Sequence, residues 1–224
     1  APLVSRGTEN LLVVDIGGGS TELVWIDLSQ VPKHDRPEAI MRLHTGFKKG
    51  LSDVPEARVV DWISVPLGVA TLREHFNDVE DDAARFALMS WYFEENLANF
   101  SPYHTAAPTE QFQIVGTSGT VTTVAASHLG LKRYDRTKVD GLSMTSDQID
   151  TVIHSYLAMG PNGRRNDPRI GSDRHALIMS GAAILQTLTR CWPTDRLSVA
   201  DRGLREGLLY AQMGADGELD LAKR

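Results

Sequence analysis

Residues 15–22 read Asp-Ile-Gly-Gly-Gly-Ser-Thr-Glu, a segment that combines two carboxylates, two hydroxyls and three consecutive glycines. Backbone amides in a glycine-rich turn can form a nest for an anion, because no Cβ stands in the way. Asp15 ends an apolar run and suits a hard cation such as Mg2+, and Glu22 could orient water or a second metal-bound water. The residues predicted to hold phosphate are Gly17, Gly18, Gly19, Ser20 and Thr21. The alternative is a plain tight hairpin with exposed acids.

A second turn rich in Gly, Ser and Thr follows the apolar run at 114–115 and leads into a predicted helix. A helix N-terminus carries free N–H groups and partial positive charge, so it suits an anion. The residues that would line the same cleft are Gly116, Thr117, Ser118, Gly119 and Thr120. The alternative is that Thr117 or Ser118 simply caps the helix.

Arginines form a third group of candidates. Arg205 lies in the segment 201–210, where it could order the cleft or belong to a packed helix surface. Four arginines also fall within 161–175, a local excess that suits either a polyanion or a solvated loop. These four are Arg164, Arg165, Arg169 and Arg174, and similar candidates are Lys48, Lys49 and Arg73.

Strands and helices must position these turns. Apolar alternation predicts strands over 11–16, 22–27, 111–116 and 197–201, another strand beginning at 62, and a candidate strand at 39–43. Helical periodicity and capping signals predict helices over 78–100, 119–130, 144–160, 176–192 and 203–214. This mixture predicts an α/β layered fold with a mixed sheet flanked by helices.

The composition limits the function classes. The 224 residues carry a net charge of −6, which gives no sign of nucleic-acid affinity. No apolar run approaches the roughly 18 residues that would span a membrane. The single cysteine, Cys191, fits a reducing cytoplasm, so a cytoplasmic location is expected. The seven histidines show no metal-ligand spacing.

Four segments together resemble the exopolyphosphatase / guanosine pentaphosphate phosphohydrolase (Ppx/GppA) family: VVDIGGGSTELV, SVPLGVATLRE, VGTSGTVTT and ADRGLREGLL. The resemblance spans roughly residues 11–210. It implies the ribonuclease H-like fold of the actin, Hsp70 and sugar-kinase superfamily, in which phosphates lie between glycine hairpins of two lobes. It also implies hydrolysis of terminal phosphoanhydride bonds of polyphosphate or guanosine pentaphosphate, with Mg2+ at Asp15 and Glu22 assisting.

The resemblance covers the second lobe only. We expect residues 1–10 to be a linker from a missing first lobe, 11–214 the second lobe, and 215–224 a charged tail. The family's general-base glutamate belongs to the first lobe, and Glu9 lies in the wrong context to replace it. The chain alone is therefore expected to be nearly inactive, with a homodimer favoured by exposed apolar surface. Two alternatives are the nucleotide lobe of a sugar- or acetate-kinase-like phosphotransferase and a non-enzymatic phosphate-sensing module.

Overall fold

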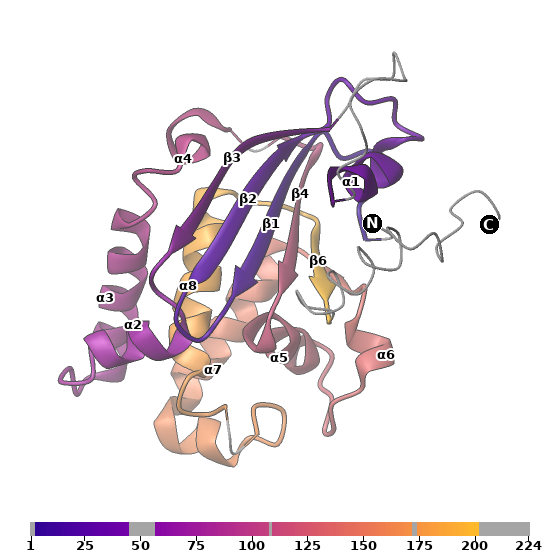
Figure 1. Ribbon diagram of the computed structural model, residues 1–224. Helices are drawn as coiled ribbons and strands as arrows, with labels where there is room; N and C mark the ends of the chain where they lie inside the picture. Colours follow the sequence, from indigo (N-terminus) through magenta and orange to yellow (C-terminus); the bar gives the residue numbers. More distant parts are fainter. Residues whose placement is uncertain (1–2, 45–56, 108, 172–173, 202–224) are drawn as a thin grey trace.

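A six-stranded mixed sheet organises the computed structural model, which describes residues 3–44, 57–107, 109–171 and 174–201 (Figure 1). The strand order is β3-β2-β1-β4-β6-β5. The strands are β1 (Asn10–Ile16), β2 (Thr21–Asp27), β3 (Arg58–Val65), β4 (Phe112–Thr117), β5 (Ser143–Met144) and β6 (Leu197–Ala200). Because β1, β4 and β6 run parallel, their carboxyl ends lie at one edge of the sheet, where the β1–β2 hairpin also turns.

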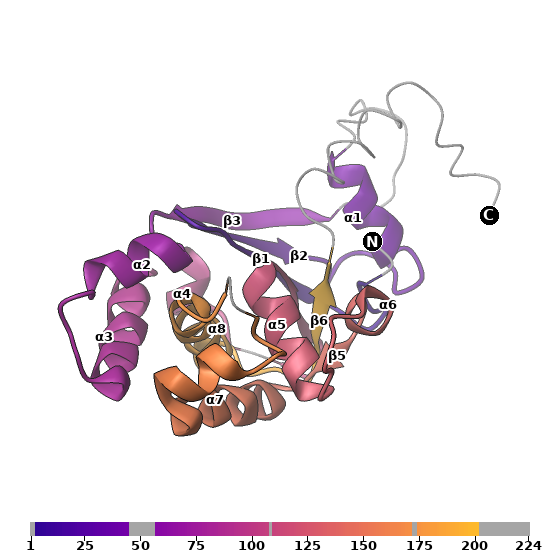
Figure 2. The ribbon, with the colours of Figure 1, turned by 90° about the horizontal axis from the view of Figure 1, so that it is seen from below.

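Helices cover the two faces of the sheet unequally. Figure 2 shows α2, α3, α5, α7 and α8 on one side and α1 on the other. The helices are α1 (Arg36–His44), α2 (Val69–His75), α3 (Asp82–Glu95), α4 (Ser101–Thr105), α5 (Gly119–His128), α6 (Arg136–Val139), α7 (Ser146–Asn166) and α8 (Ile178–Cys191). In the described part of the chain, no helix is both long enough and apolar enough to cross a bilayer.

Side-chain alternation along the central strands divides the core in two. Leu12 and Val14 of β1 face the main helical layer, together with Trp25 of β2. Leu11 and Ile26 point to the opposite face, where they pack in a smaller cluster with residues beside α1. Asp15 follows Leu11 and Val13 in this alternation, so its side chain lies on the face that the main helical layer leaves uncovered.

Most predicted elements are confirmed, with informative differences. The candidate strand at 39–43 is wrong: these residues belong to α1, which begins just before Pro37, at a position where proline suits a helix. The helix predicted over 78–100 is shorter, because α3 ends at Glu95. The helix that starts at the capping box of Thr145 and Gln148 continues past a kink at Gly160, where φ is 64°.

The predicted helix over 203–214 lies outside the described residues. The short strand β5 and the short helix α6 were not predicted, because two to four residues give no readable periodicity.

Candidate phosphate and metal site

The glycine loop, defined here as residues 17–20, connects β1 to β2 and rests on the first turn of α2. The amide of Gly17 donates to the carbonyl of Ser20 at 2.9 Å, which closes the turn. The carbonyls of Gly17 and Gly18 accept hydrogen bonds of 2.9 Å from the amides of Val69 and Ala70, respectively. The N-terminus of α2 is therefore occupied by the loop and is not available to a ligand.

The same contacts orient the loop amides. In a trans peptide the N–H points opposite to the carbonyl, so the amides of Gly18 and Gly19 point away from α2. Neither amide has an acceptor among residues that the structure describes, nor does that of Ser20. Both glycines are exposed. The amides are thus free to bind an anion, as the nest interpretation requires.

Two of the loop glycines are not required by the chain's own packing. A Cβ at Gly18 or Gly19 would meet nothing within 4 Å among the residues that the structure describes, and neither glycine adopts a left-handed backbone. Gly17 is different, because its Cβ would lie 2.9 Å from the carbonyl of Ser20. The open space over Gly18 and Gly19 is what close approach of a ligand to the backbone would need.

The sequence analysis did not single out Gly68, which precedes α2. A Cβ at Gly68 would lie 2.4 Å from the carbonyl oxygen of Gly17 and 2.5 Å from the carbonyl carbon of Gly18. Only glycine therefore lets α2 approach the loop this closely.

An acid pair, defined here as Asp15 and Glu22, lies beside the loop. The two residues are direct partners in the antiparallel β1–β2 ladder. Burial, and next the negative charge of Glu22, raise the pKa of the Asp15 carboxyl. Like charges opposite one another on a sheet repel, so a bound cation would relieve this repulsion.

One carboxylate oxygen of Glu22 already accepts hydrogen bonds from neighbouring side chains. Its Oε1 accepts hydrogen bonds from the hydroxyls of Ser20 at 2.5 Å and Ser64 at 3.0 Å. Thr21, also predicted to bind phosphate, is buried, and its hydroxyl donates to the carbonyl of Leu67 at 2.8 Å. Ser20 is therefore the loop hydroxyl nearest to the acid pair.

The acid pair fits Mg2+ better than a metal that needs a full set of protein ligands. Among residues whose placement is described, no group of three or more His, Cys, Asp or Glu side chains could hold a metal ion. Mg2+ in phosphate sites typically uses one or two carboxylates, with water and phosphate oxygens completing its octahedron. Asp15, with Glu22 in support, supplies that number.

The second turn, between β4 and α5, lies next to the first. Thr117 at the end of β4 is the ladder partner of Asp15, so the two turns share one edge of the sheet. The Oγ of Ser118 accepts from the amide of Val121 at 3.1 Å, which confirms that Ser118 caps the helix. Ser118 also has an unusual φ of 156° for a residue other than glycine.

The remaining predicted residues of this turn differ in exposure. Gly119 is exposed at the first position of α5, whereas Gly116 is buried and its Cβ would lie 3.2 Å from the side chain of Val121. Thr120 is buried and packs on Gly181 of α8, where a Cβ would lie 2.0 Å from the Thr120 hydroxyl oxygen. Thr117, Ser118 and Gly119 are thus the part of this turn that a ligand can reach.

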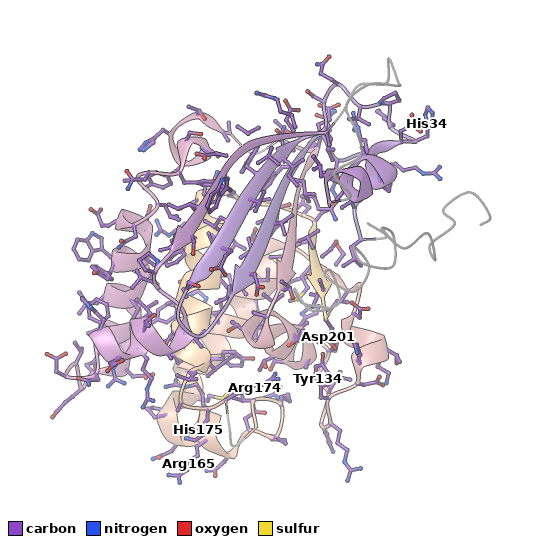
Figure 3. The ribbon with its side chains drawn as sticks, in the orientation of Figure 1. His34, Tyr134, Arg165, Arg174, His175 and Asp201 are labelled. Atoms are coloured by element: carbon purple, nitrogen blue, oxygen red, sulfur yellow. The ribbon has the colours of Figure 1, made fainter. Side chains whose placement is uncertain are left out.

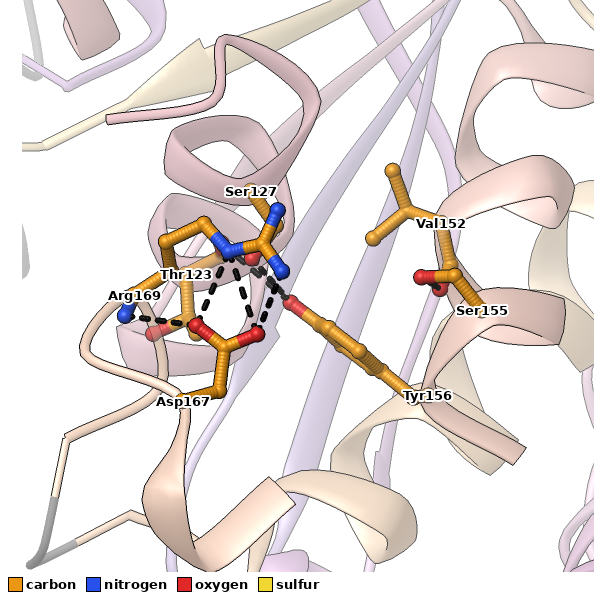
Figure 4. A network of polar contacts seen from close by, with 7 residues as sticks. All are labelled: Thr123, Ser127, Val152, Ser155, Tyr156, Asp167 and Arg169. Carbon is orange, nitrogen blue, oxygen red and sulfur yellow. Dashed lines mark hydrogen bonds and ion pairs between the residues drawn. The ribbon is translucent and has the colours of Figure 1, made fainter. Parts of the chain in front are cut away.

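The four arginines at 164–174 lie in different environments. Arg174 donates from Nη1 to the Thr123 hydroxyl at 2.8 Å and to the Gly119 carbonyl at 3.3 Å, beside the second turn (Figure 3). Arg164 is buried and bonds Asp82 of α3. Arg169 forms an ion pair with Asp167, next to the Tyr156 hydroxyl (Figure 4). Arg165 is exposed.

A small polar cluster flanks the second turn at the end of β6. Arg136 forms an ion pair of 3.2 Å with Asp201. Burial, and then the nearby Asp201 carboxylate, raise the pKa of Tyr134 to about 12. Arg205 and Gly203 lie outside the described residues. Glu9 pairs with Arg36 at 3.2 Å.

Comparison with known proteins identifies the family. The family model described as the Ppx/GppA phosphatase family matches residues 4–215. The chain belongs to this family. The prediction made from the four sequence segments is therefore confirmed, and so is the ribonuclease H-like, actin-type fold that it implied.

Individual relatives of the Ppx/GppA family agree. A guanosine-5'-triphosphate,3'-diphosphate pyrophosphatase from Aeromonas salmonicida is 26% identical over 220 residues, which are 98% of this chain and 37% of that protein. A putative exopolyphosphatase from Haemophilus influenzae is 23% identical over 89% of this chain and 51% of that protein. The chain thus spans about half or less of the length of these relatives.

Solved structures show the same fold. A crystal structure of the Ppx/GppA family member of Aquifex aeolicus superimposes with a TM-score of 0.67 at 25% identity, covering 93% of this chain and 57% of that one. An exopolyphosphatase from Cytophaga hutchinsonii gives a TM-score of 0.68 at 19% identity, covering 96% and 62%. The latter likeness concerns the fold alone.

Proposed function

We propose that this chain forms the phosphate- and Mg2+-binding part of an enzyme that hydrolyses terminal phosphoanhydride bonds, in inorganic polyphosphate or guanosine pentaphosphate. The observation that supports this most directly concerns one β-hairpin. It carries exposed loop amides without an acceptor in the described part of the chain, and an acid pair beside them. Family membership favours this phosphatase activity over the kinase-like alternative.

Some of these residues would bind the phosphate or Mg2+, and others would hold the binding groups in position. The amides of Gly18 and Gly19 would bind the terminal phosphate, and the Ser20 hydroxyl would hold Glu22 in place. Arg174 and the amide end of α5 would meet the phosphate from the second turn. Asp15 and Glu22 would hold Mg2+, which supplies neutralisation of the charge on the phosphate oxygens when bound.

We further propose that the general base comes from a part of the enzyme outside residues 1–224. Glu9 is held by Arg36, and Glu22 already accepts two hydroxyl hydrogen bonds. Neither carboxylate is therefore well suited to take a proton from an attacking water. The short share of the relatives that this chain covers supports the same proposal.

Calorimetric titration with pyrophosphate tests the binding role. Binding should require Mg2+, and Asp15→Asn should weaken it at least about tenfold, because the metal ligand is lost. Equal pyrophosphate affinity with and without Mg2+ would contradict the assignment of the acid pair. If pyrophosphate binds neither with nor without Mg2+, the proposed phosphate site is wrong.

A phosphate-release assay tests whether the general base lies outside this chain. Purified 1–224 should bind the substrate yet release phosphate about 10²–10⁴ times more slowly than a complete family enzyme, as expected when a general base is missing. Release at a comparable rate would show that the base lies within this chain.

A further inference from the structure

Helix α3 carries apolar side chains on two opposite faces. One face packs against α8, α7 and α2, and its buried residues are Phe86, Met89 and Phe93. Four exposed apolar residues form a second row, called here the outer stripe: Ala84, Ala87, Leu88 and Trp91. Their spacing of i, i+3, i+4 and i+7 places them along one side of the helix, away from the buried face. A surface helix normally presents polar residues on that side, so this stripe is a candidate contact surface.

The outer stripe has the dimensions of a contact for one helix. The step from Ala84 to Trp91 covers about 10 Å of the helix axis, or two turns. Ala84 and Ala87 are small enough to let a second backbone approach closely, whereas Leu88 and Trp91 project into solvent, 38% and 57% exposed. Figure 2 shows α3 at the outer side of the helical layer, where a further helix could pack beside it.

Carboxylates gather around the outer stripe. Residues 78–95 contain six acidic side chains and one arginine, so this segment alone carries −5 of the net charge of −6. The acids are Asp78, Glu80, Asp81, Asp82, Glu94 and Glu95. The charge on this part of the surface therefore favours a cationic partner.

The acids differ in whether the chain already neutralises them. Asp82 is paired with Arg164, and Glu94 is paired with Arg190. Asp81 and Glu95, by contrast, are exposed at the two ends of the outer stripe. The arginine of the segment, at position 85, donates to the backbone carbonyls of residues 79 and 80 rather than to a carboxylate. Negative charge thus remains at both ends of the apolar row.

We propose that the outer stripe binds a basic amphipathic helix of a partner protein. The apolar side chains of that helix would cover Leu88 and Trp91, and its lysines or arginines would pair with Asp81 and Glu95. Such a contact would attach the chain to a partner, which goes beyond the proposed hydrolysis and does not depend on it.

A second copy of α3 fits the outer stripe less well. Two copies packed antiparallel would bring the acidic first turn of each, with Asp81, close to the acidic last turn of the other, with Glu95. Two copies packed in parallel would bring Glu95 close to Glu95. Like charges that meet at an interface oppose association, so charge selects a basic partner over self-pairing.

Fluorescence anisotropy with synthetic helical peptides tests this inference. The probe is a labelled peptide of about 18 residues, with leucines at i, i+3, i+4 and i+7 and lysines elsewhere, in about 0.15 M salt. The unmodified protein should bind this Leu/Lys peptide and not a matched Leu/Glu peptide. Trp91→Ala should weaken binding at least about tenfold, because large aromatic side chains supply much of the binding energy of an interface. Glu95→Lys should weaken it about threefold.

Two matched controls distinguish this surface from general stickiness or charge. Trp62→Ala removes another exposed tryptophan, on β3, and Glu110→Lys makes an equal charge change in the exposed turn before β4. Both controls should bind the Leu/Lys peptide as the unmodified protein does.

Several outcomes would overturn the proposal. These are unchanged affinity in Trp91→Ala, equal weakening by Trp62→Ala, and equal affinity of the unmodified protein for the Leu/Glu peptide. If sedimentation velocity shows that the unmodified protein self-associates and that Trp91→Ala does not, a second copy occupies the stripe and the proposed partner is wrong.

Nuclear magnetic resonance of the unmodified protein gives a measurement that needs no variant for its result. The indole N–H signal of Trp91 should shift when the Leu/Lys peptide is added, while the signals of exposed Trp62 and buried Trp25 stay in place. A Trp91 signal that does not respond would contradict the proposal even if a variant failed to fold.

Discussion

Single residues decide whether this hairpin is a binding site or an ordinary turn. Asp15 and Glu22 face each other across two strands, although opposite charges or apolar pairs would stabilise the sheet better. Gly18 and Gly19 leave space that nothing in the described chain fills. Both features lower the stability of the free protein slightly and become favourable when a cation and a phosphate bind.

Replacing Asp15 should change stability and ligand binding in opposite directions. Asp15→Asn removes a half-buried charge and its repulsion with Glu22, so the metal-free protein should melt about 1–2 °C higher, a small gain because solvent screens the pair. The same change should weaken Mg2+-dependent pyrophosphate binding at least about tenfold. Thermal melts and calorimetry check the two effects. Asp27→Asn removes a carboxylate that is paired with Arg58 away from the site, so it is the control for binding and should leave pyrophosphate affinity unchanged.

The pH dependence of metal binding follows from the raised pKa of Asp15. Protons compete with Mg2+ for this carboxylate at a higher pH than for an ordinary aspartate. Affinity for Mg2+ should therefore fall as pH decreases from 7 towards the Asp15 pKa. By linkage, the metal-free protein should gain stability over the same decrease, since the folded state takes up a proton more readily than the unfolded chain. An affinity independent of pH between about 7 and 4 would contradict this assignment.

A side chain over the glycine loop should block the ligand without unfolding the protein. The Cβ of Gly19→Val would meet nothing within 4 Å in the described part of the chain, so the melting temperature should change by no more than about 2 °C. Pyrophosphate affinity should fall at least about tenfold, because the side chain would cover the loop amides. Unaltered affinity in a folded Gly19→Val variant would show that the phosphate binds elsewhere.

At the scale of elements, α2 and the glycine loop form one unit. Gly68→Ala would place a methyl group 2.4 Å from the Gly17 carbonyl oxygen, a backbone contact that cannot relax without moving α2. We expect a loss of about 2 kcal/mol in the free energy of unfolding and weaker phosphate binding together. Gly18→Ala is the matched control, since its Cβ would meet nothing within 4 Å in the described part of the chain. Denaturant titration of both variants provides the comparison.

The sequence predicted most elements that place the site, because their patterns are local. Apolar alternation identified β1, β2, β4 and β6, and the capping box of Thr145 located the start of α7. The helix α1 was missed because residues 39–43 were interpreted as a candidate strand, although Pro37 suits an early helix position. The site was predicted through its glycines and acids.

Long-range contacts account for what the sequence could not show. The close approach of Gly68 to the loop joins residues about fifty positions apart, and no local pattern encodes it. In the same way, only the packing of Arg164 on Asp82 and of Arg169 on Asp167 distinguishes these two structural arginines from Arg174 at the second turn.

At the scale of the whole molecule, the sheet is covered unequally. The main helices pack on one face, while the edge strand β3 exposes apolar side chains, among them Val59, Val60 and Trp62, the last of these 68% exposed. Exposed apolar clusters of this kind commonly mark contact surfaces. The predicted homodimer and the predicted first lobe are both consistent with such a surface and stay predictions.

Association through β3 has a direct test. Trp62→Arg should shift the protein towards monomer at high concentration without altering pyrophosphate affinity, because this side chain is exposed and lies outside the phosphate site. Sedimentation velocity over a range of concentrations measures the change. Trp91→Arg on α3, also well exposed at 57%, is the control and should leave the association state as it was.

The hydrogen bonds from Val69 and Ala70 to the glycine loop also have a consequence for measurement. These two amides are shielded from solvent deuterium only while the hairpin stays seated on α2. The exchange rates of these two amides should therefore report how often the hairpin separates from α2. Pyrophosphate bound at the glycine loop should slow the exchange of both amides, although it does not contact them.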